Sequence, residues 1–159
     1  MVFLSVMSCV IYTIIIVSIL LKKPLLVIFH YPPKIREKVE KLGLIENEEP
    51  SIIQKLSTIL FFGFFFGVIV YIYFYCSTFQ EAFWKTFILW NILNLYDVFI
   101  IDLLWFCHSE GVKIKGTEDM KEYSNVKFHI MNGFKGMIIG LLVSCISGFV
   151  IQFIQYLFF

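Results

Sequence analysis

Four long apolar runs determine what this chain can fold into. A helix needs about 20 apolar residues to cross a bilayer, and each run reaches that length. In lipid a polypeptide must satisfy its backbone hydrogen bonds internally, which a helix does. Only 16% of the 159 residues are charged, whereas soluble domains carry about a quarter. We therefore predict a single all-α domain over residues 1–159, an integral membrane four-helix transmembrane bundle with spans at about 2–21, 55–77, 82–107 and 129–158.

The basic residues indicate how this bundle is oriented. Lysine and arginine concentrate in two loops, residues 22–54 and 108–128, whereas the turn after the second span has only Lys85. Basic loops stay in the cytoplasm, so both loops are expected there and both termini outside. The first run is followed by Lys22-Lys23 instead of a small-residue cleavage site, so we expect a retained span. The net charge of +1 gives no indication of nucleic-acid binding.

A short amphipathic helix is expected in the first cytoplasmic loop. Ile35, Val39 and Leu42 recur at helical spacing after Lys34, and Gly43 is placed to end the helix. A helix that is basic on its polar side is expected to lie flat on the inner membrane surface. The alternative is a solvated helix over the mouth of the bundle.

Short motifs mark the starts of two spans and a turn in the second loop. Ser51-Ile-Ile-Gln54 and Thr78-Phe-Gln-Glu81 have the spacing of capping boxes, with a hydroxyl three positions before a polar residue. Gly116-Thr117-Glu118 is typical of a turn rather than a strand.

Small residues recur every four positions in two of the predicted spans. They are Gly63 and Gly67 in the second span, and Gly136, Gly140, Ser144 and Gly148 in the fourth. Such ridges let helix backbones approach, and packing drives helix association in lipid. The partners expected are therefore the lipid bilayer and either a second copy of the chain, as a homo-oligomer, or another membrane protein. The spacing does not distinguish a contact within the bundle from one between protomers.

Polar residues in the third span form the candidate site. A charged group inside a bilayer is costly unless it meets a partner, a proton or water, so Asp97 and Asp102 indicate a functional site. At 100° per residue, the polar residues of this span form one broad sector that must face protein or water. The candidate ligands for a solute or ion are Asn91, Asn94, Asp97, Asp102, His129, Asn132 and Lys135. His108 and Glu118 are expected at the cytoplasmic mouth.

One interpretation of these residues is purely structural. Asp102 pairs with Lys135, which enters the membrane at a comparable depth, and the asparagines bond across helices. Such bonds specify packing more than they stabilise it. This interpretation leaves Asp97, near mid-depth, without a cationic partner.

We favour a second interpretation, a polar pocket open to the cytoplasm that binds or translocates a small solute or ion. Asp97 is then a proton- or cation-binding carboxylate, and Asn91 and Asn94 supply oxygen ligands. Asp102 and His129 form the cytoplasmic exit. Four spans are few for a solitary transporter, so this interpretation requires a homo-oligomer or a partner protein.

Two alternatives stay open, an inner-leaflet enzyme acting on a lipid or amphiphile, and an accessory subunit of a membrane complex. The enzyme would use Asp102, His108, Glu118 and His129. Its motifs are weak, because two aspartates five residues apart do not share one face of an α-helix and no H-x-x-H pattern occurs. The four cysteines are isolated, without a C-x-x-C pair. We therefore expect neither a metal nor a cofactor.

Several motifs resemble those of small four-span bacterial membrane proteins. They are Tyr31-Pro32-Pro33 with Arg36 and Leu42-Gly43, Asn94-x-x-Asp97 with Asp102, Gly116-Thr117-Glu118, Tyr123, His129 and Gly133-x-x-Gly136. The resemblance covers residues 31–140 and implies a location in the bacterial cytoplasmic membrane. It also implies that the turn of the second loop and the acids of the third span form one site. It implies no activity, so no catalytic or binding residue is transferred.

Overall fold

The protein is all-helical over the part of the chain that the computed structural model describes, residues 2–44, 67, 70–71 and 74–158. No strand occurs in these ranges. Gly63 and the predicted capping box Ser51-Gln54 lie outside these ranges, and so does most of the predicted second span. The elements are α1 (Val2–Lys22), η1 (Pro24–His30), α2 (Pro33–Lys41), α4 (Phe79–Tyr96), η2 (Asp97–Trp105), η3 (Phe106–His108), η4 (Glu110–Val112), η5 (Lys121–Ser124) and α5 (Val126–Phe158).

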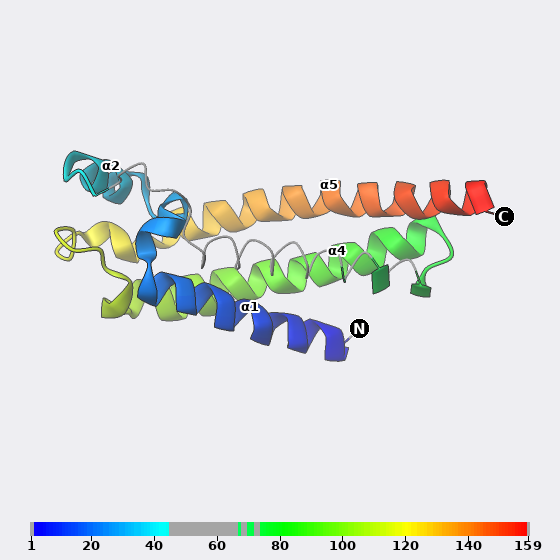
Figure 1. Ribbon diagram of the computed structural model, residues 1–159, viewed down its shortest axis with the longest axis horizontal. Helices are drawn as coiled ribbons and strands as arrows, with labels where there is room; N and C mark the ends of the chain where they lie inside the picture. The colour runs from blue at the N-terminus through cyan, green and yellow to red at the C-terminus, as the bar shows by residue number, and fades with distance from the viewer. Residues whose placement is uncertain (1, 45–66, 68–69, 72–73, 159) are drawn as a thin grey trace.

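Three helices of the described chain are long and apolar enough to cross a membrane: Ser5–Lys22, Phe79–His108 and Val126–Leu157. They match three of the four predicted spans, and the fourth stays a prediction. Figure 1 shows α1, α4 and α5 running along the long axis, with α2 and the loops gathered at one end. Both chain termini lie toward the other end (Figure 1).

The outer surfaces of these helices are apolar. Ile14 on α1 is 62% exposed, and Ile138 and Leu142 on α5 are 62% and 60% exposed. Large contiguous apolar surfaces are rare on soluble monomers, and they fit contact with lipid. The described helices therefore have the surface expected of a protein located in a membrane.

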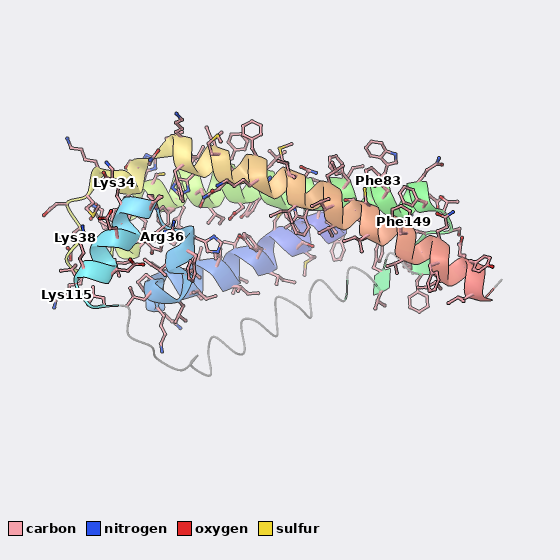
Figure 2. All side chains as sticks on the ribbon, turned by 90° about the horizontal axis from the view of Figure 1, so that it is seen from above. Lys34, Arg36, Lys38, Phe83, Lys115 and Phe149 are labelled. Atoms are coloured by element: carbon pink, nitrogen blue, oxygen red, sulfur yellow. The ribbon has the colours of Figure 1, made fainter. Side chains whose placement is uncertain are left out.

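α4 and α5 form an antiparallel pair. The start of α4 lies beside the C-terminal part of α5, where the ring centroids of Phe79 and Phe149 are 5.1 Å apart. Figure 2 shows Phe83 and Phe149 near each other at this end. Further along the pair, the indole Nε1 of Trp90 donates a 2.9 Å hydrogen bond to the carbonyl of Gly136. The pair is thus joined by both packing and side-chain bonds.

Small residues of α5 make this close approach feasible. A Cβ added to Gly136 would overlap the Asn94 side chain, and one added to Gly140 would overlap the Trp90 ring. Ser144 is fully buried, and its hydroxyl donates to the Gly140 carbonyl over 2.6 Å. The ridge on α5 therefore faces α4 of the same chain.

Gly148 and Gly67 also belong to the predicted ridges of small residues. A Cβ at Gly148 would lie 2.6 Å from the Phe79 ring, so Gly148 also contacts α4. Gly67 has nothing within 4 Å of an added Cβ. The ridge on α5 is occupied within the chain and gives no support to self-association.

The two loops fold together into a cap, which we define as residues 24–44 and 106–125. Its buried core consists of Ile28, Tyr31, Ile35, Val39, Phe106, Val112, Ile114 and Tyr123, with Leu20 from the end of α1. The Tyr31 hydroxyl donates to the Val112 carbonyl over 2.8 Å. Burial and the neighbouring Tyr123 raise the pKa of Tyr31, so its hydroxyl remains a donor. The cap is thus a packed unit rather than two separate loops.

The amphipathic helix of the first loop is confirmed as α2, but its expected position on the membrane surface is wrong. Ile35 and Val39 are fully buried in the core of the cap. The helix lies over the end of the bundle, as in the alternative prediction. Its apolar residues pack there against apolar residues of the second loop. Gly43 ends it with a φ of +67°, and the Leu44 amide donates back to the Val39 carbonyl.

The predicted capping box at the start of α4 is also confirmed. The Thr78 hydroxyl accepts from the Glu81 amide over 3.2 Å. The Glu81 carboxylate accepts in return from the Ser77 amide over 2.8 Å, one residue before the cap position.

Replacing Gly140 by alanine tests whether α4 and α5 depend on this ridge. The added Cβ meets the Trp90 ring, so we expect a loss of about 1–3 kcal/mol in the free energy of unfolding. The measurement is reversible denaturation in detergent micelles. Gly67→Ala is the matched control, because it adds helix propensity without a clash. Equal stability of Gly140→Ala and the control would show that the ridge is not tightly packed.

Candidate functional site

Both membrane aspartates lie in a segment of unusual helix geometry. Beyond Tyr96, α4 continues as a π-helix, η2, over Asp97–Trp105. Hydrogen bonds in a π-helix join residues five apart, so each turn takes more residues than in an α-helix. Asp102 follows Asp97 by five residues and comes one turn later on nearly the same side. The expectation that the two aspartates lie on different faces is therefore wrong, since it assumed α-helical spacing.

Asp102 has its partner on α5. Its Oδ2 lies 3.0 Å from Nδ1 of His129, whose side chain is only 2% exposed. Lys135, the partner expected from the sequence, is exposed, and its ammonium lies 3.5 Å from Oδ1 of Asn132. The structure thus pairs Asp102 with His129 rather than with Lys135.

α1 supplies a partner for Asp97. The Tyr12 hydroxyl hydrogen-bonds to the Asp97 carboxylate. The next residue, Thr13, shares a 2.7 Å hydrogen bond with the Tyr96 hydroxyl. Two adjacent residues of α1 therefore contact two adjacent residues at the start of the π-helix. We call Tyr12, Asp97, Asp102 and His129 the three-helix cluster, because α1, the α4–η2 helix and α5 each contribute to it.

The cap covers the His129 end of this cluster. The Phe106 ring lies 5.3 Å from the His129 ring and 5.1 Å from the Tyr31 ring, centroid to centroid. Nε2 of His129 is buried and has no hydrogen-bond partner among the described residues. Buried polar atoms without a partner are rare, and they indicate a bound water, an ion or a functional role. His129 therefore carries an unused basic nitrogen beneath the cap.

The two predicted amide ligands, Asn91 and Asn94, use their Nδ2 atoms in hydrogen bonds to backbone carbonyls. Nδ2 of Asn91 donates to the Phe87 carbonyl of its own helix over 2.8 Å. Nδ2 of Asn94 donates to the Gly133 carbonyl over 3.0 Å. The Nδ2 atoms thus serve packing within and between the helices, whereas Oδ1 of Asn91 is buried and has no hydrogen-bond partner among the described residues. The role of the two amide oxygens as ligands stays a prediction.

His108 and Glu118 come together at the surface of the cap. Both line a hollow of about 380 Å³, whose lining includes neither Asp102 nor His129. Glu118 accepts from the Gly116 amide over 2.7 Å, and the backbone amides of this turn lower the pKa of its carboxyl. The hollow is thus separate from the three-helix cluster.

His30 is a further titratable group near the cluster. His30 is the last residue of η1, and it is exposed to solvent. The protein around it lowers the pKa of its imidazole, and the negative charge of Asp102 opposes that shift. Sequence reasoning missed His30 because it lies in the other loop, and missed Tyr12 because a single hydroxyl in an apolar run has no spacing signal.

Comparison with known proteins gives no assignment. No family model matches the chain, and neither a curated protein nor a solved structure does.

A double-mutant cycle of Asp102→Asn and His129→Gln measures the pair directly. We expect a coupling free energy of about 0.6 kcal/mol, the average for polar contacts between membrane helices, and at most about 1.7 kcal/mol. The same cycle with Asp102→Asn and Lys135→Gln is the control. Because the structure places Lys135 beside Asn132, its coupling to Asp102 is expected to be near zero. A larger coupling to Lys135 than to His129 would refute the observed pairing.

Proposed function

We propose that this is a membrane protein whose three-helix cluster binds or translocates a small solute or ion, most simply a cation. Two carboxylates of one π-helical segment interact electrostatically in an apolar helix bundle, and only one of them forms an ion pair with a basic side chain among the described residues. A carboxylate in such surroundings needs a positive ligand or a proton to offset its charge. The cluster therefore has the composition of a cation site.

The π-helical segment is the observation that carries this proposal. A π-helix is rare, and it is frequently found at functional sites. Here nine residues adopt it, and they bring Asp97 and Asp102 to one side of the helix. Helix packing alone gives no reason for that geometry, whereas a shared site for two carboxylates does.

The proposed orientation places the cap in the cytoplasm. Figure 2 shows Lys34, Lys38 and Lys115 together at the cap end of the molecule. Basic segments are retained on the cytoplasmic side, so both termini would lie outside. We further propose a fourth span at about residues 55–77 and a bacterial cytoplasmic membrane as the location. A homo-oligomer or partner protein would complete a transport path.

An enzyme is the second candidate, and the geometry of His129 favours it. A carboxylate that holds Nδ1 of a histidine leaves Nε2 available as a general base. A substrate of the inner leaflet would have to reach Nε2 past Phe106. Turnover of a lipid by the purified protein, lost in His129→Gln, would favour this candidate over ion binding.

Charge movement across reconstituted membranes tests the proposal. Proteoliposomes on a solid support are expected to give a transient current that Asp97→Asn abolishes, because the variant cannot hold the cation. Glu40→Gln, an exposed change on α2, is the control and should leave the current unchanged. Monodisperse elution of each variant in detergent establishes that it is folded. Equal currents from Asp97→Asn and the unmodified protein would exclude Asp97 as the site.

A further inference from the structure

The donor atoms of the three-helix cluster restrict which cation it can hold. Ions such as Ca²⁺ take about six to eight oxygen ligands, and even Mg²⁺ requires about six. Among the described residues that interact with Asp97, the oxygen donors are the Asp102 carboxylate and the Tyr12 hydroxyl. No group of three or more His, Cys, Asp or Glu suited to a metal ion occurs in the described part of the chain.

The charges in the cluster also restrict which cation it can hold. Asp97 and Asp102 are close enough to repel each other as anions. His129 can offset one negative charge when its ring is protonated, and the Tyr12 hydroxyl offsets none. A proton on Asp97 removes the remaining charge and leaves the cluster neutral without any further ligand atoms.

We propose that the ion bound at the three-helix cluster is the proton, held by Asp97 and exchanged with the Asp102–His129 pair. This inference rests on the proposed function and names its substrate. The groups that face Asp97 are Tyr12 from α1, Asp102 on its own helix and His129 from α5, with His30 of η1 beyond Asp102.

Each transfer is a simple movement of a proton between two of these groups. Asp97 releases a proton as its O–H bond breaks, and an N–H bond forms at Nε2 of His129 through intervening water. The resulting imidazolium is paired with the Asp102 carboxylate at 3.0 Å. Release of the Nδ1 proton to Asp102 restores the neutral ring. This scheme requires a nitrogen that is free to accept the proton. Nε2 of His129 meets this requirement, because it has no hydrogen-bond partner among the described residues.

The cap lies between His129 and the aqueous side. His129 is buried under Phe106, which is itself only 3% exposed and packs against Tyr31 and Tyr123. His30 is exposed and feels the charge of Asp102. In this scheme His30 is the titratable residue of the cap that would pass protons between the cluster and water.

Proton flux into proteoliposomes tests this inference. A potassium gradient with valinomycin drives the flux, and a pH-sensitive dye inside the vesicles reports it. Asp97→Asn is expected to lower the rate by a factor on the order of 100, and Asp97→Glu to retain part of it. Glu40→Gln is the control. Infrared difference spectra should show a protonated carboxyl band that Asp97→Asn lacks, which reports proton binding without transport.

The possible failures are distinguishable. Uptake of radiolabelled Na⁺ that depends on Asp97, without proton flux, would overturn the proton assignment and leave the proposed function intact. If neither ion moves and the carboxyl band is identical in the unmodified protein and Asp97→Asn, both proposals are overturned. If both Asp97→Asn and Asp97→Glu conduct protons at the full rate, Asp97 is not the proton site.

Discussion

An ionisable side chain between apolar helices must be offset by a partner, and this requirement links the three described spans. Asp102 meets His129 of α5, and Asp97 meets Tyr12 of α1. Because these partners come from different helices, the polar contacts determine how α1 and α5 are placed around the π-helix. The weak average strength of such contacts means that they specify an arrangement more than they stabilise it.

Packing between the helices supplies the stability that the weak polar contacts do not. The small residues of α5 let Trp90 and Asn94 of α4 reach its backbone, and the two helices come close enough for both side chains to bond there. The cap then closes the same end of the bundle with a buried aromatic group around Tyr31 and Phe106. The three-helix cluster therefore lies between a closely packed helix pair and the folded cap.

Features with a local signal were predictable from the sequence. The apolar runs, the Thr78 capping box, the end of α2 at Gly43 and the helical spacing of Ile35 and Val39 all depend on neighbouring residues. The position of α2 was not predictable, because its apolar face fits either a membrane surface or another loop. Only the folded second loop, with Val112 and Ile114, decides between them.

The candidate site was predicted in part. Asp97 and Asp102 stand out because acids are costly in an apolar run, and His129 was placed on the same side of the membrane. The change from α-helix to π-helix has no periodic signal, so the sequence could not show that the two acids share a side. The choice of His129 over Lys135 depends on side-chain directions that helical wheels do not resolve. The hydrogen bonds from Nδ2 of Asn91 and Asn94 to backbone carbonyls cannot be read from spacing either.

The state of the His129 ring tests the central claim most directly. Nitrogen-15 NMR of histidine-labelled protein in lipid nanodiscs reports on all three histidine rings, and comparison with His129→Gln identifies the signals of His129. We expect an Nδ1 signal of a proton hydrogen-bonded to a carboxylate, which moves when Asp102 is changed to asparagine, and an Nε2 signal that titrates. A ring whose two signals are unaffected by Asp102→Asn and by pH would contradict a buried Asp102–His129 pair that exchanges protons.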